Sequence, residues 1–148
     1  MKPTELSIED KGFALSRSAV FSRLAATSAQ LLAETMKTER LAAGEVLFEA
    51  GDVSDRVYLL VEGALKVTVG SHRSRALRPG DLLGEYGMFA GLTRTATVTA
   101  ESPATLLSLD YPRFRAFLLA VPGAALVLLQ VAVERMLEVE AKSEPSAK

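Results

Sequence analysis

Residues 84–98 read GEYGMFAGLTRTATV, and this stretch decides how the rest of the sequence is interpreted. It opens on Gly84-Glu85, and after a short insert it reaches Arg94 at the start of a strand-like run. The insert is long enough for one helical turn, whose free N–H groups favour a phosphate. Arg94 adds a planar guanidinium that suits phosphate oxygens, and the carboxylate of Glu85 can hold a ribose hydroxyl. The residues therefore predict an anion cradle, and the alternative is a glycine-rich turn beside a solvated arginine.

Short β-type runs separated by glycine turns lie on both sides of this stretch. The runs cover residues 46–48, 56–61, 64–69, 95–100 and 105–109. The turns contain Gly44, Gly51, Gly63 and Gly80, each with an acidic residue beside it. Such spacing predicts a compact barrel or jelly roll rather than a parallel sheet.

Helical patterns flank the β region at both ends. Residues 13–40 carry apolar side chains at helical spacing, and residues 112–121 and 123–141 return to the same pattern. The 18 residues 116–133 contain no charge, a length at the threshold for a membrane span. Pro122-Gly123 interrupts that run, so we expect two shorter helices and no membrane span. The predicted order is a helical segment, a small barrel and two helices.

Composition narrows the classes of function. The 148 residues include 17 basic and 18 acidic side chains, a balance that argues against direct nucleic-acid binding. Cysteine is absent, which excludes disulfides and thiol catalysis, and the single histidine, His72, makes a barrel metalloenzyme untenable. No Ser-His-Asp set or paired carboxylates stand out, so we expect neither an enzyme nor a metal site. Residues 1–23 lack the pattern of a secretory signal, which favours a cytoplasmic protein.

The ordered set of motifs resembles the cyclic-nucleotide-binding domain family. Gly84-Glu85, the nine-residue step from Glu85 to Arg94, and the following Thr95-Ala96 match the phosphate-binding cassette of that family. Upstream, AGEVLF at 43–48, Gly51-Asp52 and YLLVEG at 58–63 are similar to its barrel strands and turns. The resemblance covers about residues 20–140.

The resemblance implies a mixed α and β fold: an eight-stranded β jelly-roll barrel flanked by an N-terminal helical segment and two C-terminal helices. It divides the chain into an N-terminal extension over 1–19, the binding domain over 20–141 and a disordered tail over 142–148. It also implies a regulatory sensor that binds cyclic AMP or cyclic GMP, needs no other cofactor, and couples the ligand to movement of the last helix. The alternative is a protein-interaction module that has kept the fold and lost the ligand.

The resemblance also assigns the ligand contacts. Arg94 pairs with the exocyclic oxygens of the cyclic phosphate, and Glu85 accepts a hydrogen bond from the ribose 2′-hydroxyl. Backbone N–H groups complete the cradle at Gly84, Tyr86, Gly87 and Ala96. The sequence departs from the usual cassette at Tyr86, Gly87 and Thr93, where a small aliphatic residue, Ala or Ser, and Pro are common. The charged residues of the cassette, Glu85 and Arg94, are retained. Gly87 and Thr93 are expected to make the insert more flexible.

Two further positions bear on the base. Thr95 can hydrogen-bond the 2-amino group of a syn guanine, yet bacterial family members with a hydroxyl here often favour cyclic AMP. Cyclic AMP is therefore the preferred ligand, and cyclic GMP stays open. Arg135, in VERM at 133–136, matches an arginine that closes over the purine in bacterial cyclic-nucleotide-gated potassium channels. The alternative for Arg135 is an ion pair with Glu138 on the helix surface.

The last helix is apolar on more than one face. Leu126, Leu129, Val133 and Met136 follow three-four spacing, while other apolar residues occupy the remaining faces. One face must cover the barrel, and a second predicts contact with a like helix in a homodimer or with an unidentified effector protein. No helix-turn-helix pattern follows residue 141, so any role at DNA is expected to involve another chain.

Overall fold

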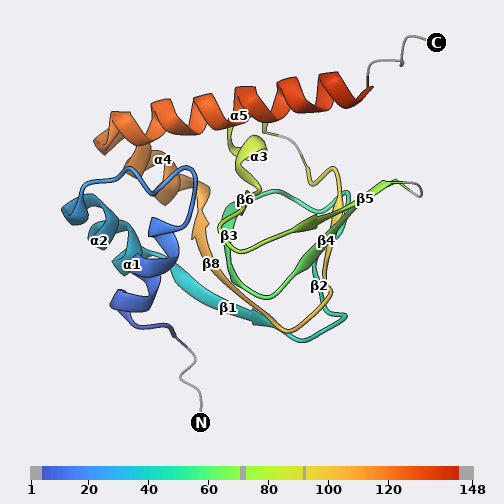
Figure 1. Cartoon of the computed structure of the whole chain (residues 1–148), viewed down its shortest axis with the longest axis horizontal. Helices are drawn as coiled ribbons and strands as arrows, with labels where there is room; N and C mark the ends of the chain where they lie inside the picture. The colour runs from blue at the N-terminus through green and yellow to red at the C-terminus, as the bar shows by residue number, and fades with distance from the viewer. Residues whose placement is uncertain (1–4, 71–72, 92, 144–148) are drawn as a thin grey trace.

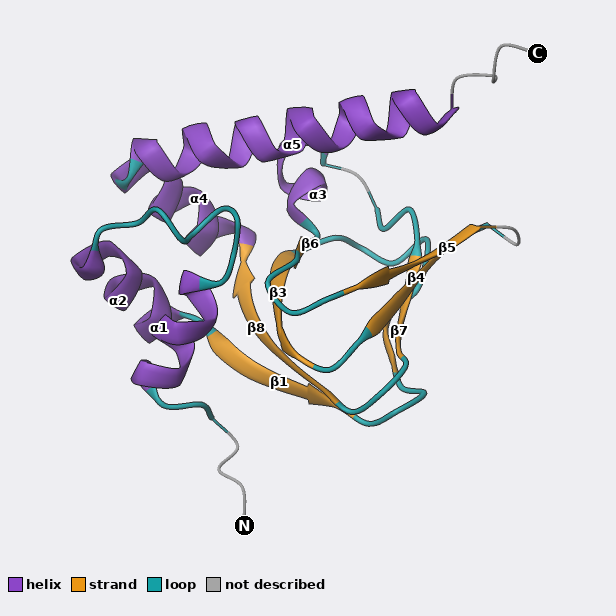
Figure 2. Cartoon of the chain, viewed as in Figure 1, coloured by secondary structure: helices purple, strands orange, loops and turns teal. Residues whose placement is uncertain are grey.

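The computed structural model describes residues 5–70, 73–91 and 93–143, so the expected hairpin connection at His72 and most of the expected tail lie outside it. Two antiparallel sheets form a jelly roll, and helices gather at one end of it (Figure 1). The last helix crosses the top of the molecule in the same view, which Figure 2 colours by secondary structure. The described residues form eight strands, which confirms the mixed α and β fold with helices before and after the barrel.

Each sheet has four strands. One sheet runs in the order β1-β8-β3-β6, with bounds Lys37–Leu41, Ala104–Asp110, Arg56–Glu62 and Leu82–Leu83. The other runs β2-β7-β4-β5, with bounds Val46–Phe48, Thr97–Ala100, Leu65–Val69 and Arg73–Leu77. β8 lies between β1 and β3 and is buried from Ala104 to Leu109, which explains its largely apolar sequence.

The described part of the chain contains five helices: α1 (Ile8–Ser16), α2 (Ala26–Thr35), α3 (Glu85–Ala90), α4 (Tyr111–Ala120) and α5 (Pro122–Ser143). α4 begins where the Asp110 carboxylate accepts a hydrogen bond from the Arg113 N–H. α5 starts at Pro122, because proline fits the first turn of a helix, where its missing N–H costs nothing. The break predicted at Pro122-Gly123 is therefore confirmed.

No single helix among the described residues is long and apolar enough to cross a membrane. α4 and the first part of α5, to Glu134, reach that length and composition together, but they are bent by 113° at their junction.

Several segments differ from the expectation. Residues 13–40, expected to be helical throughout, form the end of α1, a turn segment, α2 and the strand β1. Phe13 and Leu31, which suggested a continuous apolar face, are exposed. β1, β5 and β6 have no counterpart in the sequence-based prediction, because KTERL and RSRAL are largely polar and β6 has only two residues. Pairing of β1 with β8 and of β5 with β4 decides their conformation, and local sequence does not encode such pairing.

Two buried clusters form the core, on opposite faces of the β1-β8-β3-β6 sheet. Tyr58 and Leu60 point into the barrel, whereas Leu59 points toward the helices, as expected for alternating strand residues. The cluster on the helical side includes Ala14 and Leu15 of α1. The segment expected to be an N-terminal extension therefore contributes side chains to the core.

Lys11 of α1 is buried in this region and anchors the start of the chain. Its Nζ donates to the Met36 carbonyl at 2.7 Å and lies 2.7 Å from the Glu5 carboxylate. Glu5 also accepts the Thr38 N–H at 2.9 Å, which ties the residues before α1 to β1. Burial alone raises the pKa of Glu5, but hydrogen bonds from Lys11 and Thr38 outweigh it and hold the pKa below its usual value.

We expect Lys11→Met to lower the free energy of unfolding by about 1–3 kcal/mol, since the Met36 carbonyl loses the Lys11 donor and Glu5 keeps only its hydrogen bonds from Thr38. Because the pKa of Glu5 is lowered by folding, its contribution to stability is present above the unfolded pKa and is lost as the pH falls through the folded value. Urea unfolding at neutral and acid pH measures both effects, with Lys66→Met, at an exposed position of β4, as the control. Equal midpoints for Lys11→Met and the wild type would contradict this role.

Candidate functional site

The predicted cassette starts at Gly84, directly after β6. Its φ of 92° lies in the left-handed region that favours glycine. A Cβ at this position would lie 2.7 Å from the Arg56 carbonyl oxygen and 2.7 Å from Arg94 Nη1. The Arg94 guanidinium therefore packs against the backbone of Gly84, and the fold brings the two ends of the cassette together.

The side chain of Arg94 is turned inward, and the residue is only 7% exposed. The guanidinium carbon lies 4.2 Å from the centroid of the Phe48 ring and 5.8 Å from that of the Tyr58 ring. Nη2 donates to the Arg56 carbonyl at 2.9 Å and is 4.0 Å from Asp55 Oδ1. Stacking on the aromatic rings and this hydrogen bond hold the cation in one orientation.

Arg94 Nε is buried and has no hydrogen-bond partner among the described residues. A buried N–H without an acceptor is destabilising, because its interaction with water is lost and not replaced. An anionic group that accepts a hydrogen bond from Nε would remove this penalty. The unpaired Nε is therefore the feature of the site that points to an anionic ligand.

Glu85, the first residue of α3, is 3% exposed. Among the residues that the structure describes, only Lys11, Glu85 and Arg94 are both charged and buried, so two of the three lie in the cassette. Ionisable groups are rarely buried unless they are paired or have a role in binding.

Tyr58, beneath Arg94, stays a neutral aromatic surface. Burial raises the pKa of its phenol, and the charge of Glu39 raises the pKa further. The ring therefore keeps the electron-rich face that attracts a guanidinium at physiological pH.

The other expected site residues lie along the same segment and on α5. Thr95 is exposed and Ala96 is half-buried, just before β7, which begins at Thr97 rather than at Thr95. Tyr86 belongs to α3 and Arg135 to α5, but their side chains fall outside what the structure describes. The base contacts expected of Thr95 and Arg135 therefore stay predictions.

Gly87 allows a close approach that a side chain would block. A Cβ here would overlap Ser54 Oγ and lie 2.6 Å from the Tyr111 hydroxyl oxygen. Glycine therefore lets α3 rest directly on Ser54 and the start of α4. No local sequence pattern marks Ser54 and Tyr111, nor Phe48 and Tyr58 beneath Arg94, because pairing between distant strands brings them to the site.

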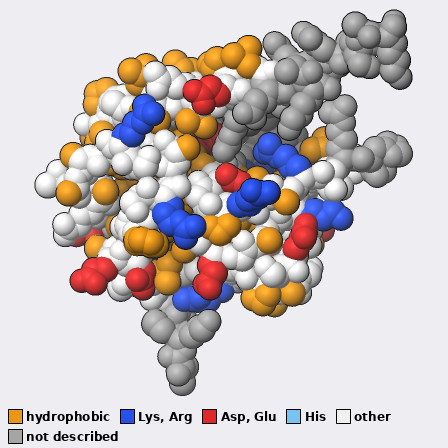
Figure 3. Space-filling model, in the orientation of Figure 1, with side chains coloured by type: hydrophobic (Ala, Val, Ile, Leu, Met, Phe, Trp, Pro, Cys, Tyr) orange, Lys and Arg blue, Asp and Glu red, His pale blue; other side chains and the backbone are white. Residues whose placement is uncertain are grey.

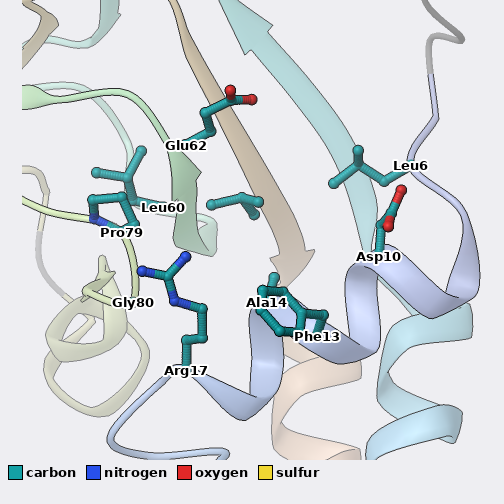
Figure 4. Close-up of a pocket in the computed structure, with 10 residues that line it drawn as sticks. Leu6, Asp10, Phe13, Ala14, Arg17, Leu60, Glu62, Pro79 and Gly80 are labelled. Atoms are coloured by element: carbon teal, nitrogen blue, oxygen red, sulfur yellow. The ribbon is translucent and has the colours of Figure 1, made fainter.

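A separate pocket lies between α1 and β3 (Figure 4). It has a volume of about 340 Å³, and its lining includes residues of α1, of β3 and of the turn at Pro79 and Gly80. In Figure 4, Arg17, the residue that follows α1, extends toward that turn. No residue of 84–98 lines this pocket, so it is distinct from the cassette.

Comparison with models of known protein families finds a match over the middle of the chain. The family model described as the cyclic nucleotide-binding domain matches residues 38–120, more than half of the chain. This chain belongs to the cyclic nucleotide-binding domain family. Residues Gly84 to Ala96 of the cassette lie within the matched part of this cyclic nucleotide-binding domain, whereas Arg135 lies beyond it.

Curated relatives carry the domain within longer proteins. The HTH-type transcriptional regulator Cmr of Mycobacterium tuberculosis is 33% identical over 109 residues, which are 71% of this chain and 45% of that protein. A cyclic nucleotide-gated potassium channel of Mesorhizobium japonicum is 29% identical over 116 residues, which are 78% of this chain and 32% of that protein. This chain thus spans less than half the length of both relatives.

Solved structures share the fold of this cyclic nucleotide-binding domain. The N-terminal domain of a transcriptional regulator from Streptomyces coelicolor is 30% identical with a TM-score of 0.68, and the match covers 91% of this chain and 98% of that chain. The catabolite activator protein of Thermus thermophilus is 25% identical with a TM-score of 0.75, over 84% of this chain and 61% of that chain. The structural likeness therefore extends over most of the chain.

Proposed function

We propose that this domain binds a cyclic nucleotide through Arg94 and Glu85, prefers cyclic AMP to cyclic GMP, and acts as a regulatory sensor. The observation that carries the proposal is the buried Arg94 guanidinium, which packs against the glycine that opens the cassette. Its Nε has no acceptor within the described part of the chain. A cyclic phosphate supplies anionic oxygens for this N–H. Glu85, buried next to Gly84, offers a carboxylate that accepts a hydrogen bond from a ribose hydroxyl.

The proposed output is a change in α4 and α5. Met88 of α3 belongs to the same buried cluster as Phe114 of α4 and Leu128 of α5, so these helices share one core. Because a close-packed core transmits small displacements, a ligand that moves α3 repacks α4 and α5. The nucleotide shifts the population only if it binds one arrangement more tightly than the other. In the bound arrangement, Arg135 is proposed to cover the base.

A second function, the ligand-free interaction module, is favoured by one observation. The Arg94 guanidinium already stacks on Phe48 and donates to the Arg56 carbonyl. The protein itself therefore supplies some of the interactions that this cation needs when it is buried. A module of this kind would need no nucleotide and would act through its exposed surface alone.

Isothermal titration of the full, nucleotide-stripped chain with cyclic AMP and cyclic GMP separates the two functions. We expect saturable binding of both, with the lower Kd for cyclic AMP. A lower Kd for cyclic GMP would overturn the base preference and keep the sensor. No heat and no thermal shift with either nucleotide would overturn the sensor and favour the interaction module.

We also propose that α5 pairs with α5 of a second copy of this chain. Leu126, Leu129, Val133 and Met136 on its outer face are 45% to 60% exposed. Figure 3 shows hydrophobic side chains along the edge of the molecule that α5 forms. The three-four spacing of these residues is that of a coiled-coil seam, in which a like helix buries them.

Leu129→Lys is expected to convert the dimer into a monomer, because it places a charge in the middle of the seam. Sedimentation equilibrium measures the mass of the wild type and the variant over a range of concentrations. Gln130→Lys adds the same charge beside the seam and is expected to leave the dimer intact. A wild type that sediments as a monomer would contradict the pairing and leave an effector protein as the partner of this face.

A further inference from the structure

The hydroxyl of Tyr111 connects three segments that are far apart in the sequence. It donates to the Gly84 carbonyl at 2.5 Å, and it forms a second hydrogen bond with Ser54 Oγ. A phenol has one proton, and here that proton goes to Gly84, so the Ser54 hydroxyl must donate to Tyr111. The result is a hydrogen-bond chain that runs from Ser54 through Tyr111 to Gly84.

These two hydrogen bonds lie directly under α3. Gly87 of α3 has no room for a side chain, because a Cβ would overlap Ser54 Oγ and approach the Tyr111 hydroxyl. Gly84, which accepts the last hydrogen bond of the chain, is the residue that precedes α3 and contacts Arg94. The position of α3 is therefore set by Ser54 and Tyr111 together.

Residues 54–56 form hydrogen bonds both with Tyr111 and with Arg94. The Asp55 carbonyl accepts the Tyr111 N–H at 3.0 Å, and the adjacent Arg56 carbonyl accepts a hydrogen bond from Arg94 Nη2 at 2.9 Å. Residues 54–56 thus contact the first residue of α4 on one side and the guanidinium of Arg94 on the other. A ligand that draws Arg94 away from Arg56 acts on the same three residues that position Tyr111.

We propose that Tyr111 is a positioning residue that links the cassette to the C-terminal helices. Its hydroxyl, oriented by Ser54, ties the carbonyl of Gly84 to the first turn of α4, so that a phosphate seated on Arg94 displaces α4 and, through their shared core, α5. This inference rests on the proposed nucleotide binding, because the cassette must hold a phosphate for anything to be transmitted.

The test uses Tyr111→Phe in the full chain, which removes one oxygen and keeps the ring that packs on the core. Calorimetry gives the Kd for cyclic AMP, and hydrogen exchange across 111–137 is compared with and without saturating nucleotide. We expect the Kd to rise by about threefold to tenfold, as for one lost hydrogen bond. We expect the nucleotide-dependent change in exchange to fall by at least half.

Ser54→Ala provides the second variant and leaves Tyr111 itself intact. Since the hydrogen bond of Ser54 reaches Gly84 through the Tyr111 hydroxyl, the double variant is expected to be no worse than Tyr111→Phe alone, a non-additivity that two independent contacts would not give. Ser16→Ala, at an exposed position of α1, removes a hydroxyl that bonds only to the Phe13 carbonyl in the described part of the chain, and it is expected to behave as the wild type. If Tyr111→Phe fails to fold, Ser54→Ala carries the comparison.

The outcomes separate this inference from the proposed function. A wild type that binds no cyclic nucleotide overturns the proposed function and, with it, the linkage. A wild type that binds cyclic AMP and shows no change in exchange over 111–137 overturns the linkage alone. The linkage is also overturned if Tyr111→Phe and Ser54→Ala show the full wild-type change.

Discussion

Arg94→Ala is expected to weaken cyclic AMP binding by at least about tenfold. A hydrogen bond to a charged group contributes roughly 1.5–3 kcal/mol, and the variant loses every one that the guanidinium makes to the phosphate. The substitution also removes the hydrogen bond to the Arg56 carbonyl and the contact with Phe48, so Tm is measured beside the Kd. The change in Kd, taken at a temperature where the variant is fully folded, then reports on the site rather than on stability.

Two further variants distinguish the geometry of Arg94 from its charge. Arg94→Lys keeps the charge and loses both the planar fork and Nε, so its Kd is expected to lie between those of the wild type and Arg94→Ala. Arg78→Ala removes an exposed positive charge elsewhere and is expected to leave the Kd unchanged. A Kd for Arg94→Ala equal to that of the wild type would remove Arg94 from the site.

Gly84→Ala is expected to lower the free energy of unfolding by roughly 2–5 kcal/mol and to weaken nucleotide binding as well. A left-handed backbone costs a residue with a Cβ about 1–2 kcal/mol, and overpacking adds about 1–3 kcal/mol. The overpacking arises because the new methyl group would lie 2.7 Å from both the Arg56 carbonyl oxygen and Arg94 Nη1. Binding weakens because the same methyl group displaces the guanidinium.

Gly44→Ala is the matched control for this prediction. Gly44 has a similar φ of 85°, but nothing lies within 4 Å of a Cβ built there. It is therefore expected to lose only the backbone part, about 1–2 kcal/mol, and to keep the wild-type Kd. Equal losses in urea unfolding of the two variants would contradict the close approach of Arg94 to Gly84.

The fold was predictable where local chemistry decides the structure. The break at Pro122-Gly123 and the glycine turns at Gly44, Gly51 and Gly63 mark real boundaries, because proline and left-handed glycine act locally. β1 and β5 were not predictable, since their polar residues become strands only by pairing with β8 and β4. The helical pattern placed Phe13 on an apolar face, but its side chain is exposed, because a single apolar residue need not face the core.

The sequence alone was enough to select the charged residues of the candidate site, but it did not predict which residues surround them. Glu85 and Arg94 stood out because the spacing of the cassette lies within one continuous segment. Tyr111 lies 27 residues from Gly84 and 57 from Ser54 along the chain, so their hydrogen bonds follow from the tertiary fold alone. Gly87 shows the same limit: its departure from the usual residue suggested flexibility, and only the packing of α3 gives the reason for it.

A side-chain NMR titration decides whether Arg94 holds the phosphate. The Nε–H signal of Arg94 is assigned by its loss in Arg94→Lys and is followed as cyclic AMP is added to the wild type. This N–H has no acceptor among the residues that the structure describes, and a phosphate oxygen would become one, so we predict a shift that saturates with the bound fraction. Binding of cyclic AMP that leaves this signal unchanged would contradict a site built on Arg94.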